Sequence, residues 1–280
     1  MSGRWVELGD GVLVRRYAEL DQSLGLIIGD GACLVIDTRS DLVRGAEWAA
    51  AVREVTRVPW TVVITHEHWD HCFGTAEFLP TEVWGHERCR TNLEATGIEQ
   101  RDNIARHYRQ YGQEHDRPDL TELADLISVV EPVLPDRLVG DRAELSVGGR
   151  TVVLAYFGPG HTDNDIVVQV PDAGVVFAGD LIEQGTPPSF ADSHPMLWPA
   201  AVEGIIGLAP RVVSPGHGEP VDVDFVVRQQ AELTQIAELC SDVVTDRCSM
   251  ADALLRSPYP AEYLQTAVSR VRTSRSDLAK

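Results

Sequence analysis

The sequence predicts a four-layer α/β sandwich, in which two mixed β-sheets pack together and helices cover both outer faces. Strand-like apolar runs occur in two batches along the chain, and helical stretches follow each batch. Histidine and aspartate residues stand directly after several of these runs, in both batches. Two packed sheets need helices on their outer faces to bury the remaining apolar side chains, which gives the order αββα.

The first batch occupies the first quarter of the chain. Apolar residues spaced by about 3.6 positions predict a helix between its third and fourth strands, and Gly29-Asp30-Gly31 predicts a turn between its second and third. The last run of the batch is almost wholly apolar, as expected for a strand buried on both faces. The predicted elements are strands Val12–Tyr17, Leu24–Ile28 and Cys33–Asp37, helix Asp41–Val55 and strand Trp60–Thr65.

A polar, helix-forming stretch over residues 86–129 predicts an insertion of two or three helices before the second batch of strands. Gly148-Gly149 predicts a hairpin within that batch. We expect a catalytic domain over residues 1–222 and a helical extension over 223–280 packed on the same domain. The remaining predicted elements are strands Arg137–Val139, Ala143–Val147, Thr151–Tyr156, Ile166–Val170 and Val175–Ala178, helix Trp198–Leu208, strand Val212–Ser214, and helices from Asp224 onward, broken at Ser257–Pro260.

The charge of the chain excludes several classes of function. Its 280 residues include 43 Asp and Glu against 24 Lys and Arg, a formal charge of −19. Binding to nucleic acid and to anionic membranes depends on Lys and Arg, so neither partner is expected. Lys280, the last residue, is the only lysine, which excludes Schiff-base chemistry and a phosphate-binding loop with an internal lysine.

The cysteines and the N-terminal residues predict a reduced, cytoplasmic protein. The five cysteines are an odd number and form no Cys-x-x-Cys pair, so we expect neither a disulfide framework nor a structural zinc knot. The first residues contain no apolar run of signal-peptide length, and the chain has no stretch of about 20 apolar residues. The expected partner is a small-molecule substrate, and a homodimer is compatible with the sequence.

One motif carries most of the chemistry. His66-x-His68-x-Asp70-His71 follows the predicted buried strand directly. In an extended chain His66 and His68 share one face and can hold one cation, while Asp70 and His71 turn into a helix and can hold a second. Imidazole and carboxylate ligands suit zinc, iron or manganese.

Three more ligand-type residues stand after strands of the second batch. They are His161 in Gly158-Pro159-Gly160-His161, Asp180 in Ala178-Gly179-Asp180 and His217 in Pro215-Gly216-His217. The glycines permit tight turns that direct these side chains to one edge of the sheet. With the first motif they complete two coordination spheres.

These seven residues, in this order, resemble the ligand pattern of the metallo-β-lactamase superfamily. The resemblance covers about residues 12–220 and includes the turn and strand of Gly29–Asp37. It implies the metallo-β-lactamase fold and two zinc ions per chain, with iron or manganese as alternatives. By resemblance, the first metal is bound by His66, His68 and His161, the second by Asp70, His71 and His217, and Asp180 bridges both.

Asp180 stands where one subclass of true β-lactamases has a metal-binding cysteine, so the chain looks closer to the glyoxalase II and lactonase branch. The resemblance implies a dinuclear zinc hydrolase in which a bridging hydroxide attacks the carbonyl of a small ester, thioester, lactone or amide. Asp70 would be the catalytic residue that orients the hydroxide and returns its proton.

Three other functions remain open at this point: a mononuclear iron enzyme similar to persulfide dioxygenases, a β-lactam hydrolase, and a non-catalytic metal-binding scaffold. The insertion over 86–129 and the segment Thr186–Trp198 are the candidate lids of the pocket. We expect the aromatic and apolar residues of the second segment either to line that pocket or to pack against the helix that follows. These residues are Phe190, His194, Met196 and Trp198.

Overall fold

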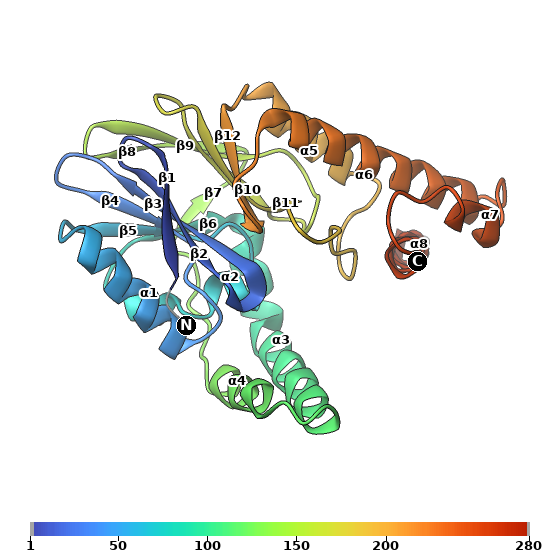
Figure 1. Cartoon of the computed structure of the whole chain (residues 1–280), viewed down its shortest axis with the longest axis horizontal. Coiled ribbons are helices and arrows are strands. Elements are labelled where there is room, and N and C mark those ends of the chain that lie inside the picture. Colours follow the sequence, from blue (N-terminus) through green and yellow to red (C-terminus); the bar gives the residue numbers. More distant parts are fainter. Residues whose placement is uncertain (1–2, 279–280) are drawn as a thin grey trace.

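The computed structural model describes the backbone of residues 3–278 and the side chains of residues 3–274. It confirms the predicted fold class: two mixed arrays of strands lie face to face, with helices on both outer sides (Figure 1). The first array contains β1 (Arg4–Gly9), β2 (Val12–Tyr17), β3 (Gln22–Ile28), β4 (Cys33–Ile36), β5 (Trp60–Val63), β6 (Val83–His86) and β7 (Arg137–Val139). The second contains β8 (Arg142–Val147), β9 (Arg150–Tyr156), β10 (Ile166–Val170), β11 (Val175–Glu183) and β12 (Val212–His217).

The two arrays are joined along a narrow seam. Strand order is β7-β6-β5-β4-β3-β12-β11-β10-β9-β8, with β2 between β1 and β3. β3 and β12 share a single register pair, Gln22 with His217. Backbone and side-chain hydrogen bonds support this seam: Gly218 N donates to Asp21 O at 2.9 Å and Ser23 Oγ donates to Gly218 O at 2.9 Å.

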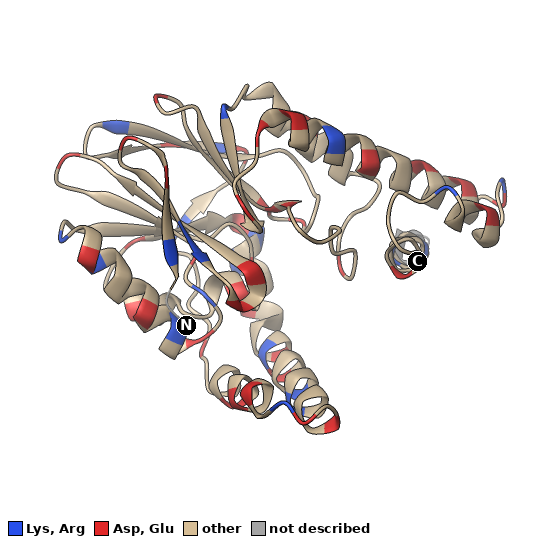
Figure 2. Cartoon of the chain, viewed as in Figure 1, with Lys and Arg blue, Asp and Glu red and all other residues tan. Residues whose placement is uncertain are grey.

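The helices form the two outer layers, and their acidic and basic residues lie mostly outside the sandwich (Figure 2). Next to the first array lie α1 (Leu42–Val55), α2 (Trp69–Cys72), the 3-10 turns η1 (Glu19–Asp21) and η2 (Thr75–Phe78), α3 (Glu87–Glu114) and α4 (Pro118–Ser128). Next to the second lie α5 (Trp198–Gly207), α6 (Val223–Val244), α7 (Met250–Leu254) and α8 (Ala261–Leu278). In the described part of the chain, no helix has an apolar stretch long enough to cross a membrane.

Three apolar clusters hold these four layers together. One lies between the two arrays of strands and contains Val14, Val63 and Val168. A second packs α1, α3 and α4 on the first array around the fully buried Trp48. The third packs α5, α6 and α8 on the second array around Trp198. Complete burial of a side chain of this size contributes about 1.5–3 kcal/mol or more to folding, so these tryptophans anchor the helical layers.

Several predicted boundaries differ from the structure. β1 and β6 were not predicted, because β1 carries charged residues on its exposed face and β6 has only four residues before α3. α2 begins at Trp69, so Asp70 and His71 already lie in the helix into which the sequence has them turn. β11 and β12 continue through Asp180 and His217, which the sequence places after the strands. The insertion over 86–129 consists of two helices, α3 and α4. The helix predicted over Asp41–Val55 has Asp41 as its N-cap, whose Oδ1 accepts from Arg44 N at 3.0 Å.

Candidate metal centre

All seven residues that the sequence predicts as ligands lie together at one end of the sandwich. In one group, the nearest ligand atoms of His66, His68, His161 and Asp180 lie within 4.8 Å of one another. A second group, formed by Asp70, His71 and His217, meets the same limit. The described residues of both arrays contribute to this centre, which therefore lies across the seam.

Asp180 lies between the two groups. Its carboxylate is 3.5 Å from Nε2 of His161 in the first group. It is 3.2 Å from Nε2 of His71 and 3.4 Å from Nε2 of His217 in the second. This carboxylate is therefore placed to contact cations held by either group.

Local geometry explains why the first motif supplies residues to both groups. The chain bends at residues 65–67 after β5, where the sequence predicts extended backbone, and His68 is the extended residue that precedes α2. The single turn of α2 then directs Asp70 and His71 to the second group. Asp180 depends on Gly216, because a Cβ atom at that position would lie 1.9 Å from Asp180 Oδ1. Only glycine permits this approach of β12 to the carboxylate.

Four of the five imidazoles have a partner for the nitrogen that faces away from the centre. His71 Nδ1 lies 2.8 Å from Asp37 Oδ2, and His68 Nε2 lies 2.9 Å from Asp192 Oδ2. The other two contacts are His66 Nδ1 to Thr65 Oγ1 at 3.0 Å and His217 Nδ1 to Leu20 O at 2.7 Å. Such acceptors hold a proton on the outer nitrogen and leave the inner lone pair available to a metal.

Asp37 organises part of this arrangement. It adopts a φ of 61°, a left-handed conformation that aspartate tolerates better than most residues. Its carboxylate accepts from Thr65 N at 2.8 Å and from Thr65 Oγ1 at 2.9 Å, in addition to its contact with His71. Residues held in sparsely populated backbone conformations cluster at functional sites.

The inner nitrogens fit a bound cation. Nε2 of His161 lies 2.8 Å from Nδ1 of His68, and Nε2 of His71 lies 3.3 Å from Nε2 of His217. Two lone pairs at these distances repel each other unless a proton or a cation lies between them. Nε2 of His66 is buried without a hydrogen-bond partner among the described residues. The donor set of imidazoles and carboxylates is the one that zinc, iron and manganese prefer.

Electrostatics divide the imidazoles into two kinds. Burial lowers the pKa of His66 well below its ordinary value and that of His161 to about 4, so both are neutral. Burial also lowers the pKa of His71 and of His217, but Asp180 and the other neighbouring carboxylates together outweigh it and raise both. The centre therefore holds protons when no cation is bound, and cation uptake displaces them.

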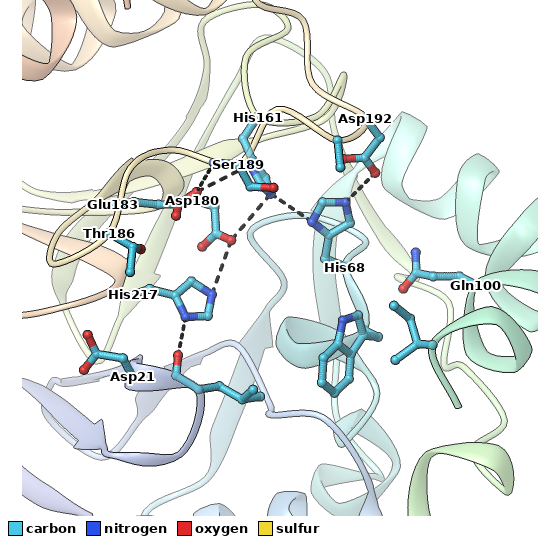
Figure 3. Close-up of a pocket in the computed structure, with 14 residues that line it drawn as sticks. Asp21, His68, Gln100, His161, Asp180, Glu183, Thr186, Ser189, Asp192 and His217 are labelled. Carbon is cyan, nitrogen blue, oxygen red and sulfur yellow. Dashed lines mark hydrogen bonds and ion pairs between the residues drawn. The ribbon is translucent and has the colours of Figure 1, made fainter. Parts of the chain in front are cut away.

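A cavity of about 650 Å³ opens onto this centre (Figure 3). Both predicted lids contribute to its wall: α3 supplies Gln100 and Ile104, and the segment after β11 supplies four residues. The complete lining is Leu20, Asp21, His68, Trp69, Gln100, Ile104, His161, Asp180, Glu183, Thr186, Ser189, Ala191, Asp192 and His217.

The aromatic and apolar residues predicted for the second lid do not line the cavity. Phe190 and Trp198, the first residue of α5, are buried with ring centroids 5.6 Å apart, so they pack in the core, and neither His194 nor Met196 lines the cavity. Tyr108 packs on Trp69. Of the basic residues near the C-terminus, Arg270 donates to Ser193 O at 2.9 Å, whereas Lys280 and the side chain of Arg275 lie outside the described residues.

Two side chains next to the ligands, Thr162 and Cys72, have structural roles. Thr162 Oγ1 donates to Asp165 at 2.7 Å and does not contact a ligating imidazole. Cys72 is buried, and burial raises the pKa of its thiol well above the ordinary value, which is consistent with packing and not with a nucleophile.

Three residues at the centre, Asp37, Asp192 and Glu183, are not indicated by any pattern in the sequence. Asp37 lies in the quoted Gly29–Asp37 segment, but its unusual φ has no sequence signal. Asp192 reaches His68 only because its loop folds back over the centre. Glu183 faces the cavity because the register of β11 with β12 shifts between Gly179 and Glu183, which changes the regular alternation of faces.

The αββα layers and the His/Asp cluster define a protein of the metallo-hydrolase type. A sequence model of the metallo-beta-lactamase superfamily matches residues 18–217. The chain therefore belongs to the metallo-beta-lactamase superfamily.

Individual relatives are distant. A metallo-beta-lactamase type 2 of Bacteroides fragilis is 25% identical over 113 residues, which are 39% of this chain and 45% of that protein. The chain thus matches less than half the length of this curated relative. The metallo-beta-lactamase FIM-1 from Pseudomonas aeruginosa, in its mono-zinc form, is 18% identical with a TM-score of 0.63, over 85% of this chain and 97% of that chain.

A sec-alkylsulfatase from Pseudomonas sp. aligns with 96% of this chain and 50% of its own, with a TM-score of 0.75 and 13% identity. This chain spans half the length of that structure. A metallo-beta-lactamase from Pontibacter korlensis gives a TM-score of 0.60 at 17% identity, over 83% of this chain and 99% of that chain. At such identities these structures show the shared fold alone.

Proposed function

We propose that the protein is a dinuclear zinc-dependent hydrolase of a small ester, thioester, lactone or amide. The observation that carries this proposal is the arrangement of inner donor atoms in two adjacent groups, with Asp180 between them, at the base of a cavity. The first zinc would be held by His66, His68 and His161. The second would be held by Asp70, His71 and His217, with Asp180 as the bridge.

When bound, two divalent cations would supply a water of lowered pKa and a Lewis acid for a carbonyl oxygen. The chain itself holds the groups that act around them. Burial raises the pKa of Asp70, but His71 and His217 together outweigh burial and lower it to about 2, so the carboxylate stays ionised. Asp70 is therefore able to accept a proton from an attacking water and to return it to the leaving group.

The outer hydrogen bonds of the imidazoles support this chemistry. Asp37 and Asp192 fix the orientations of His71 and His68, so the donor atoms do not need to reorganise when a cation binds. Trp69, Leu20 and Ile104 give the cavity an apolar wall that displaces water from a bound substrate.

The direct test is a substrate screen with zinc-loaded protein. The panel consists of p-nitrophenyl esters, thioesters, lactones and a chromogenic cephalosporin, and metal content is measured in the same samples. We expect about two zinc ions per chain and turnover of an ester, thioester or lactone. One iron per chain with oxygen consumption on addition of a persulfide would contradict the proposal, as would turnover of the cephalosporin alone. Asp180→Ala and His217→Ala are expected to lose metal and abolish turnover.

A further inference from the structure

Two residues of the segment after β11 contact the first group of ligands from outside. Asp192 Oδ2 lies 2.9 Å from Nε2 of His68, the ring nitrogen that faces away from the centre (Figure 3). Two positions further along the chain, His194 N donates to Gly160 O at 2.8 Å, directly before His161. The course of this short stretch therefore sets the surroundings of two imidazoles of the first group.

The residue between these two is held by the C-terminal helix. Nε of Arg270, in α8, donates to Ser193 O at 2.9 Å. Ser193 is fully buried, and a buried carbonyl oxygen needs a hydrogen-bond donor. Because the guanidinium is charged, its hydrogen bond is stronger than one between neutral groups. Arg270 therefore anchors the stretch 192–194 to α8.

Asp192 depends on this anchor because packing does not hold its side chain. That side chain is 58% exposed, although it supports a proposed metal ligand. The segment is fixed in the core at Phe190 and again at Trp198, and residues 191–195 between them have no regular secondary structure. The carboxylate of Asp192 can therefore stay beside His68 only while the backbone that carries it stays in place.

We infer that Arg270 is a positioning residue for the first metal group, because it holds Ser193 and, through the adjacent Asp192, fixes the ring of His68. This inference rests on the proposed function, which places zinc in that group. Without the guanidinium, the buried carbonyl of Ser193 would lose its donor, and the stretch would shift toward water to replace it. Asp192 would move with the backbone, and His68 would lose the acceptor that keeps a proton on Nε2. A helix of the C-terminal extension thus takes part in building the metal centre.

The experiment measures the zinc affinity of full-length variants by competition with a chromophoric chelator. Arg270→Met removes the donors but keeps an apolar stem for packing, and we expect it to weaken zinc binding by about tenfold. Asp192→Ala removes the acceptor of His68 directly and is expected to weaken it by about 10- to 100-fold. Arg256→Met is the matched control, because Arg256 is an exposed arginine of the same extension. Denaturant unfolding of the metal-free proteins checks that each variant folds.

A double variant separates positioning from a general loss of structure. If Arg270 acts through Asp192, adding Arg270→Met to Asp192→Ala should change zinc affinity by less than about twofold, because two members of one network are not additive. An equal loss in both backgrounds would give Arg270 a merely structural role and would overturn the inference. Zinc affinity of Arg270→Met equal to that of the Arg256→Met control would overturn it as well.

Zinc binding is measured without a substrate, so the result is separable from the proposed reaction. If the two variants are coupled but no ester, thioester, lactone or amide is hydrolysed, the proposed function fails and the role of Arg270 stands. If a substrate is hydrolysed but Arg270→Met binds zinc as the control does, the role of Arg270 fails and the hydrolase stands. A wild-type protein that binds no zinc would overturn both.

Discussion

Asp37 provides the sharpest test of how the centre is built. Its carboxylate accepts from Thr65 N, Thr65 Oγ1 and His71 Nδ1, all within 2.9 Å. In Asp37→Asn, one side-chain oxygen still accepts from Thr65 N, and asparagine also tolerates the φ of 61°. The amide NH2 group, however, replaces the oxygen that faces His71.

Because an NH2 group cannot accept from Nδ1–H, the neutral His71 ring must move its proton to Nε2, the atom that faces the centre. We therefore expect the zinc affinity of Asp37→Asn to fall by about 10- to 100-fold. The metal-free protein should lose only about 1–3 kcal/mol of unfolding free energy, the cost of one unsatisfied buried group. Asp37→Ala should lose more, because it leaves two fixed donors unpaired and places alanine at a positive φ.

Zinc affinity is measured by competition with a chromophoric chelator, and stability by denaturant unfolding of the metal-free protein. Asp30→Asn is the matched control, since Asp30 is exposed in the Gly29–Gly31 turn and has the same charge. The reasoning is refuted if Asp37→Asn binds zinc as tightly as the control does.

Three further outcomes are expected. Gly216→Ala should reduce zinc content and turnover about 100-fold or more, because its Cβ would overlap Asp180 Oδ1, and elemental analysis with a kinetic assay checks this. Carboxylates raise the pKa of His71 and of His217 in the metal-free folded protein above the value of about 6.5 in the unfolded chain. The pairing therefore contributes its full stabilisation below about pH 6.5, and this stabilisation is lost as the pH rises through the pKa values of the folded protein. Unfolding and chelator titrations from about pH 6 to pH 9 should therefore show metal-free stability falling while zinc affinity rises. A thiol reagent should modify Cys248 in the native protein much faster than the four buried cysteines, and rapid reaction of two or more thiols would contradict the packing described above.

The sequence predicts the layers and the ligand set because both depend on local patterns. Apolar runs of strand length and the spacing in His66–His71 are visible without a structure, and so are the glycines before His161 and His217. The supporting acceptors are a different case. Asp192 and Glu183 reach the centre through a folded-back loop and a register shift, and neither feature is encoded in residue spacing.

The two lids show the same limit. Sequence reasoning identifies the segments that border the cavity but not which side chains face it. Phe190 and Trp198 are the residues that apolar character favours for a pocket wall, yet both are more than 97% buried in the core between the helices and the second array. Burial of such large rings in the core is worth more than partial burial in an open cavity, and the polar residues Ser189 and Asp192 face the cavity instead.

The narrow seam between the two arrays has a consequence for the lifetime of the protein. His66, His68, Asp70 and His71 come from one side of that seam, and His161, Asp180 and His217 from the other, so cations bound by both sides act as a cross-link between two halves that share one register pair. Loss of the cations should therefore speed the separation of the halves. A chelated sample should be cleaved by protease faster than a zinc-loaded one, with early cuts near residues 20–23 and 217–218. The availability of zinc would therefore determine the lifetime of the folded protein.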